Sequence, residues 1–236
     1  MASRSVTLLA FDTATERVSI ALAAQGRIHT HEAEGGARSS ARFVPAVMAL
    51  LAEGGVGVRD LDAIAFGRGP GAFTGLRIAC SVAQGLAFGA SKPVLPIDTL
   101  LAVAEDARQG ATALRVWALM DARMDEIYAA EYAHDAGGWR VLTAPMLTTP
   151  PWLHERWRAA PPEVVAGNAL AAFAGRLDTG AARRVESAMP RAAGMLELGR
   201  ALWEAGGAIE PAQALPLYVR DKVAQTTEER AAHAGS

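Results

Sequence analysis

The hydrophobic and polar positions of the first half of the chain predict a series of short strands and two longer helices. Apolar runs and period-two alternation predict strands at residues 6–12, 17–23, 27–34 and 61–67. Capping residues followed by long apolar stretches predict helices from about 39 to 53 and from about 74 to 90. The first half is therefore expected to have the order βββαβα.

The second half repeats this order. Strands are predicted at 115–121, 125–134, 139–147 and 163–166, and helices at 150–158 and 169–177. The first apolar strand of each half ends in an aspartate, Asp12 and Asp121, 109 residues apart. This spacing is too long for a solenoid and suits two related α/β lobes of mixed sheet, residues 1–108 and 109–236. The second lobe is expected to include a last helix at 190–205 and an irregular tail, and this tail could pack back on the first lobe. Residues 226–236 are expected to be disordered.

The composition and charge of the chain limit the classes of function that it can have. Lys and Arg number 23 against 25 Asp and Glu, a net charge of −2 without a basic run, so the chain is not expected to grip tRNA or DNA alone. Any nucleic-acid role would be shared with a partner. The single cysteine, Cys80, excludes a disulfide framework. No apolar run approaches the ~20 residues of a membrane span, and the N-terminal apolar stretch is too short for a signal peptide, so a cytoplasmic location is expected.

The segment GRGPGAFTGLR, residues 67–77, is a glycine-rich strand-to-helix turn. Its glycines permit positive φ and close approach of another backbone or a phosphate, and Thr74 suits a helix N-cap. No Gly-Lys-Ser/Thr follows, so it is not a P-loop. Two interpretations stay open, a tight turn with close helix packing and a phosphate contact. Arg77, in the first helical turn, suggests a salt bridge or an anion contact, with a solvated side chain as the alternative.

The two helices that flank this loop carry no charge over residues 43–52 and 78–91. A helix that is apolar all round must be covered on more than one side. The two helices either cover each other in a larger core or form an intermolecular bundle, and a two-lobed chain of 236 residues favours the bundle. The predicted partner interface consists of Phe43, Val47, Leu50, Leu51, Arg77, Ile78, Ser81, Val82 and Gly85.

No constellation for catalysis or metal binding stands out, and no catalytic or metal-binding residue is assigned. His29 and His31 share a strand face without a third ligand, and Cys80 lies among small helical residues. Asp12 and Asp121 occupy strand ends where actin-like ATPases place acids, yet the turn after Asp12 lacks glycine and the second-lobe turn offers Asn168 in place of an acid. The residues expected to form vestigial nucleotide or phosphate loops are Asp12, Thr13, Gly69, Gly71, Thr74, Gly75, Gly167 and Asn168. A stand-alone actin-like ATPase or small-molecule kinase, and a metallopeptidase, remain as alternatives.

With these residues in place, the chain resembles the TsaB (YeaZ) family, partners in tRNA threonylcarbamoyladenosine synthesis. The matching segments are FDTATERVSIAL (11–22), FVPAVMALL (43–51), LDAIAFGRGPGAFTGLRIA (61–79), DARMDEIYAAEY (121–132) and ALPLYVRDKVAQTT (214–227). They cover nearly the whole chain, densely in the first half and sparsely between 142 and 209. Ala72 departs from the family, which usually has serine there, and this weakens a phosphate role for the loop.

The resemblance implies a duplicated actin-like (ASKHA) fold and a non-catalytic subunit. Such a subunit binds and activates TsaD, the transferase, together with the ATPase TsaE, and meets tRNA through the complex. TsaD-type proteins carry an HxxxH metal pair on the first long helix, where this chain reads SSARF (39–43) without histidine. The resemblance further implies that the two uncharged helices contact TsaD or a second copy, giving a heterodimer or homodimer. No cofactor is expected, beyond a weak nucleotide contact at the subunit junction.

Overall fold

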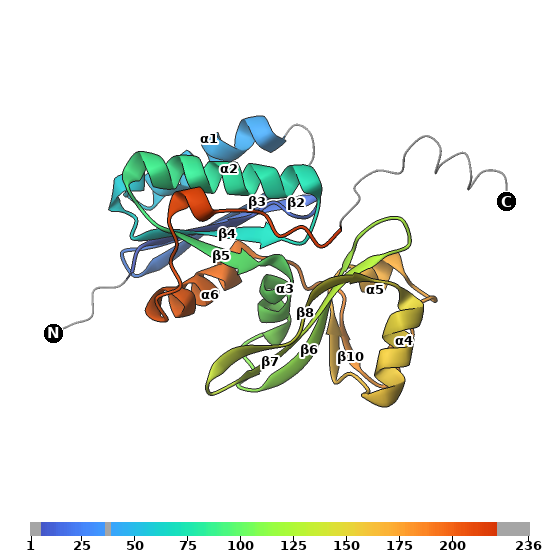
Figure 1. Ribbon diagram of the computed structural model, residues 1–236. Helices are drawn as coiled ribbons and strands as arrows, with labels where there is room; N and C mark the ends of the chain where they lie inside the picture. Colours follow the sequence, from blue (N-terminus) through green and yellow to red (C-terminus); the bar gives the residue numbers. More distant parts are fainter. Residues whose placement is uncertain (1–5, 36–38, 221–236) are drawn as a thin grey trace, which may run out of the picture.

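The computed structural model describes residues 6–35 and 39–220, which form two lobes, each built on a five-stranded mixed sheet (Figure 1). In the first lobe the strand order is β3-β2-β1-β4-β5, and in the second it is β10-β9-β6-β7-β8. Both sheets have the same connectivity, since β10 and β9 correspond to β5 and β4. The duplicated actin-like fold expected from the sequence is thereby confirmed. The expected disorder at 226–236 lies outside the described residues.

The elements follow one another in the same order in both lobes. Those of the first repeat are β1 (Leu8–Asp12), β2 (Arg17–Ala24), β3 (Arg27–Glu34), α1 (Ser39–Glu53), β4 (Ala63–Gly69), α2 (Phe73–Ala90), β5 (Val94–Asp98) and α3 (Thr99–Arg108), with the 3-10 turn η1 (Val58–Asp60). Those of the second are β6 (Leu114–Asp121), β7 (Ile127–Asp135), β8 (Gly138–Thr148), α4 (Pro150–Ala159), β9 (Val164–Ala166), α5 (Ala169–Ala172), β10 (Arg183–Val185) and α6 (Ala192–Glu204), followed by η2 (Pro211–Gln213).

Each half therefore extends the predicted βββαβα order by one strand and one helix. The sequence interpretation assigned no element to β5, α3 or β10. It also placed a helix over 169–177, whereas α5 ends at Ala172 because Phe173 leaves the helical region and Gly175 turns to φ +75°. The elements it did predict match the observed ones closely.

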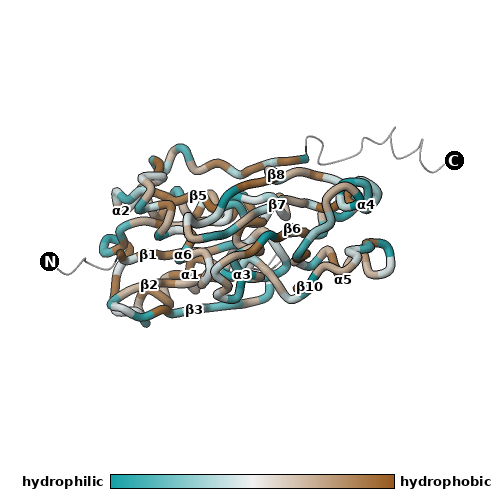
Figure 2. The backbone as a smooth tube through the Cα atoms, turned by 90° about the horizontal axis from the view of Figure 1, so that it is seen from below, coloured by the Kyte–Doolittle hydropathy of each residue, from teal (hydrophilic) through white to brown (hydrophobic). Residues whose placement is uncertain are grey.

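Helices cover both faces of the first sheet, so its central strands are buried on both sides. Leu9 and Phe11 of β1 face α1 and α2, while Leu8 and Ala10 face α6. In Figure 2 the backbone of β1 has the colour of hydrophobic residues, whereas that of the exposed edge strand β3 has the colour of hydrophilic ones.

The last helix of each repeat packs on the other lobe's sheet. Helix α3 packs against β6 and β7 of the second sheet, and α6 returns to β1 and β2 of the first (Figure 1). The final helix, which the sequence placed with residues 109–236, thus lies on the first lobe. The lobe boundary at residue 108 stays a prediction.

The parallel pairing of β1 with β4 positions the candidate site. Phe11 pairs with Phe66, which brings Asp12 at the end of β1 beside Gly67 at the start of the glycine-rich loop. Within the described ranges, no helix is long and apolar enough to cross a membrane.

Candidate functional site

The glycine-rich loop closes onto the turn that follows β1. The Thr13 hydroxyl donates to the Gly75 carbonyl at 2.7 Å, and the Ala72 N–H donates to the Ala14 carbonyl at 2.8 Å. A Cβ atom added to Gly75 would lie 1.9 Å from the Thr13 carbonyl oxygen, and one on Gly71 would lie 2.6 Å from that of Ala14. These glycines are therefore required for backbone-to-backbone packing. Of the two interpretations left open by the sequence, the geometry favours the tight turn.

The Asp12 side chain is buried beneath this loop. It is 1% exposed and accepts hydrogen bonds from the Ala14 N–H at 2.7 Å and the Thr99 hydroxyl at 2.8 Å. A Cβ on Gly67 would lie 1.8 Å from its Oδ2, so the loop backbone leaves no room above the carboxylate. Burial raises the pKa of Asp12 to about 6, although its two hydrogen bonds act to lower it. Through these two hydrogen bonds the Asp12 side chain links the turn after β1 to Thr99, and it is closed off from solvent.

This pKa predicts a pH dependence of stability. Folded Asp12 takes up its proton near pH 6, whereas an unfolded aspartate does so near pH 3.9. The free energy of unfolding from this group therefore rises as the pH falls from 7 to 5, by about 1 kcal/mol, and Asp12→Asn lacks this rise. Urea denaturation of both proteins at the two pH values checks it. Identical pH dependence in the two proteins would contradict the assignment.

The second-lobe residues are likewise engaged with the chain itself. The Asn168 side-chain oxygen accepts from the Asp121 N–H at 3.0 Å, and the Asp121 carboxylate accepts from the Arg123 N–H at 2.9 Å and lies 3.2 Å from its guanidinium. A Cβ on Gly167 would lie 2.0 Å from the Leu119 carbonyl oxygen. This turn thus mirrors the first, with glycine serving close packing.

A cavity of about 890 Å³ separates the lobes. Its wall includes the turn after β1, the start of α2, the β6–β7 turn, residues 186–190 and residues 217–220. Its size is that of a small-molecule site. Each arginine among its described lining residues is paired with an acid: Arg17 with Glu32, Arg123 with Glu16, and Arg220 with Glu126.

Asp12, Thr13, Gly69, Gly71, Thr74 and Gly75 come together around the first turn, and Gly167 and Asn168 lie at the second. Thr74 is exposed at the start of α2, while Ala72 occupies the N-cap position, so the predicted capping role of Thr74 is wrong.

Nowhere in the described part of the chain do three or more His, Cys, Asp or Glu side chains gather where they could hold a metal ion. Burial raises the pKa of the Cys80 thiol to about 11, which agrees with its expected place as a small buried side chain.

A second feature is the outer surface of α1 and α2, the two helices that lie side by side on the first sheet (Figure 1). Val44 and Met48 of α1 are 40% and 45% exposed, and Phe88 of α2 is 81% exposed. No charged residue occurs between residues 43 and 52 or between 78 and 91. We refer to Val44, Met48 and Phe88, together with four exposed small residues of the same helices (Ala49, Ser81, Gly85 and Gly89), as the outer helix surface.

The structure corrects part of the predicted interface. Phe43, Val47, Leu50 and Leu51 are at most 3% exposed and pack on the first sheet, so their prediction as partner-facing side chains is wrong. They recur at helical spacing and form the inward stripe of α1. Because both faces of α1 are apolar, the pattern alone did not show which face is covered.

The remaining predicted interface residues lie on α2. Ile78 and Val82 are half-buried against the core, whereas Arg77, Ser81 and Gly85 are exposed. The sequence interpretation missed Val44, Met48 and Phe88. No signal in the sequence singled them out, because both faces of α1 are apolar and residues 78–90 of α2 carry no charge on any face.

Arg77 has a different contact from either predicted one. Its guanidinium carbon lies 3.9 Å from the centre of the Phe73 ring, and its Nε donates to the Tyr218 hydroxyl at 3.2 Å. The side chain therefore links α2 to the C-terminal segment through a cation–π contact and a hydrogen bond.

Comparisons with known proteins agree with this fold. Residues 20–149 match the family model "TsaD: tRNA N6-adenosine threonylcarbamoyltransferase". The chain is 36% identical over 221 residues to the tRNA threonylcarbamoyladenosine biosynthesis protein TsaB of Escherichia coli (strain K12), covering 92% of this chain and 96% of that one. It is 45% identical over 133 residues to TsaB of Haemophilus influenzae, 56% of each chain.

Among solved structures, YeaZ from Pseudomonas aeruginosa superposes with a TM-score of 0.82 at 40% sequence identity, over 91% of this chain and 100% of that one. The match extends through both lobes, as the coverage of the two chains requires. On this identity, coverage and structural agreement, the chain belongs to the TsaB (YeaZ) family.

Proposed function

We propose that this chain is a non-catalytic subunit in the biosynthesis of threonylcarbamoyladenosine in tRNA, and that it binds and activates a TsaD-type transferase subunit through the outer helix surface. Membership of the TsaB family supports the pathway. A TsaE-type ATPase belongs to the same proposed assembly. The modified base in this proposal is the adenosine next to the anticodon in tRNAs that read codons beginning with adenine.

The observation that carries the proposal is the exposure of Phe88, Met48 and Val44 on two helices without intervening charge. A phenylalanine that is 81% exposed on a regular helix contributes little to the core of its own chain and is of the type that anchors protein interfaces. Exposed apolar side chains with small neighbours on the same helices also suit close helix–helix packing.

The match to the TsaD family model supports the identity of the partner. A TsaD-type subunit of the same fold carries its own equivalents of α1 and α2, and two such pairs can pack face to face as a four-helix bundle. The same surface suits a second copy of this chain, so the proposal includes a homodimer that competes with the heterodimer.

The geometry of the cleft supports a role without independent catalysis. Asp12 is enclosed by Gly67 and engaged with Ala14 and Thr99, and the cavity arginines are paired. A stand-alone actin-like ATPase would need its strand-end carboxylate at the cleft surface. The net charge of −2 supports tRNA contact through the complex and not by this chain alone. A cytoplasmic location is part of the same proposal.

Reconstitution tests the proposal. Threonylcarbamoyladenosine formed in tRNA by TsaD-type and TsaE-type subunits is measured by nucleoside mass spectrometry, with and without this chain. We expect the chain to raise the rate more than about tenfold, which corresponds to about 1.4 kcal/mol in the activation barrier. An unchanged rate would contradict the proposal. So would steady ATP turnover by the isolated chain that is lost in Asp12→Ala, which would favour the ATPase.

A further inference from the structure

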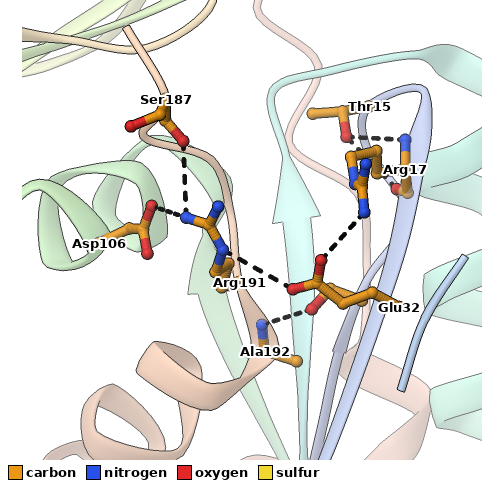
Figure 3. A network of polar contacts seen from close by, with 8 residues as sticks. Thr15, Arg17, Glu32, Asp106, Ser187, Arg191 and Ala192 are labelled. Atoms are coloured by element: carbon orange, nitrogen blue, oxygen red, sulfur yellow. Dashed lines mark hydrogen bonds and ion pairs between the residues drawn. The ribbon is translucent and has the colours of Figure 1, made fainter. Parts of the chain in front are cut away.

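The lobes are joined covalently at two places, through α3 and through residues 186–191. A polar network holds the second crossing (Figure 3). Arg191 donates to Asp106 of α3 and lies 3.7 Å from Glu32 of β3, and the Ala192 N–H donates to the Ser19 hydroxyl at 2.8 Å. Both crossings therefore meet at one polar cluster, which we call the hinge.

A third crossing is made by residues 215–220, which we call the strap. It follows η2 and runs along the first lobe at the start of α2 (Figure 1). The Leu217 N–H donates to the Arg68 carbonyl at 2.7 Å. Tyr218 accepts from Arg77, and its ring centre lies 5.4 Å from that of Phe73. These contacts fix the middle of the strap to the first lobe.

The end of the strap is fixed to the second lobe. The Arg220 guanidinium donates to the Ala122 carbonyl at 2.9 Å and lies 2.7 Å from the Glu126 carboxylate, with Met124 Sδ at 3.3 Å. The Arg220 side chain is only 15% exposed. Residues 123–125 of the receiving turn are all left-handed, with φ between 54° and 62°, although none is glycine. Such a run is uncommon for these residue types and persists where surrounding contacts hold it.

We propose that the strap is a clasp that holds the two lobes at a fixed opening and thereby sets the width of the interlobe cavity. A contact made by a third crossing restricts rotation about a hinge that the first two define. Arg220 is its decisive residue, because its ion pair is largely shielded from solvent and includes a second acceptor. The other pair across the mouth, Arg123 with Glu16, is exposed and screened, so it contributes little.

The clasp belongs to the isolated chain and does not depend on the proposed partner. Its test is the distance between the lobes in the free protein, measured by double electron–electron resonance. Spin labels on Thr30→Cys in β3 and Arg158→Cys in α4, both exposed, report on the first and second lobes in a Cys80→Ala background. We expect a narrow distribution in the parent protein and a broader one with a longer mean distance in Arg220→Ala.

Two further variants make the result decisive. Glu126→Gln keeps the shape of the acid but removes its charge, so we expect an intermediate broadening. Arg140→Ala removes an ion pair, with Asp135, that lies wholly within the β7–β8 hairpin, and we expect the parent distribution. Unchanged distributions in both Arg220→Ala and Glu126→Gln would overturn the clasp. If Arg220→Ala does not fold, Glu126→Gln alone decides: a broadened distance distribution supports the clasp, and an unchanged one overturns it.

Discussion

Gly75→Ala is expected to lower the free energy of unfolding by about 3 kcal/mol, whereas Gly85→Ala in the same helix is expected to raise it by up to about 1 kcal/mol. The added methyl group at Gly75 would lie 1.9 Å from the Thr13 carbonyl oxygen and 2.9 Å from its carbon. Both are backbone atoms of a turn tied to α2 by the bonds from Thr13 and Ala72. The turn cannot move away from the added methyl group without breaking those two hydrogen bonds.

Gly85 is the matched control. It is exposed in the interior of α2, and a Cβ there would meet nothing within 4 Å. Replacing a helical glycine by alanine at such a site removes only backbone entropy of the unfolded chain and therefore stabilises the helix. Urea denaturation followed by circular dichroism measures both variants. Equal stabilities for Gly75→Ala and Gly85→Ala would show that the loop does not pack as described.

Much of the fold was predictable because hydrophobic periodicity is local. The strands ending at Asp12 and Asp121, the βββαβα order and its repetition follow from patterns of under twenty residues. Of the missed elements, α3 does carry apolar residues at helical spacing, Leu100, Val103, Ala104 and Ala107, and was predictable, whereas the two missed strands have weak patterns. The three-residue strand β10 is mostly exposed, and β5 contains Pro96 within an edge strand, where the missing N–H is tolerated.

The candidate site was predictable only in part, because its main contacts join distant parts of the chain. The sequence identified the glycine-rich loop and the absence of charge on two helices. It did not show that Gly75 meets Thr13, 62 residues away, or that Arg77 meets Tyr218, 141 residues away. Nor did it show which face of α1 is covered, since Phe43 and Val44 are both apolar and only the packed sheet distinguishes them.

Met48→Asp combined with Phe88→Asp is expected to weaken binding to a TsaD-type subunit more than about 100-fold while the chain stays folded. Burying two large apolar side chains contributes roughly 1.5 to 3 kcal/mol each at full burial. Two carboxylates in their place would also have to be stripped of water without a partner charge. Since Met48 and Phe88 are 45% and 81% exposed in the free chain, the fold loses little.

Two control variants separate binding from folding. Val141→Asp charges a side chain that is 56% exposed on β8, away from the outer helix surface, and we expect normal binding. Val47→Asp charges a fully buried side chain of α1, and we expect loss of the fold itself. The second variant shows what a purely structural defect looks like by circular dichroism.

Isothermal titration of the folded Met48→Asp/Phe88→Asp variant into a TsaD-type subunit, beside the parent chain and Val141→Asp, tests the outer helix surface most directly. Heat of binding for the parent chain and Val141→Asp, with none for the double variant at the same concentrations, is the predicted result. Equal affinity for all three proteins would contradict the account and place the partner elsewhere on the chain.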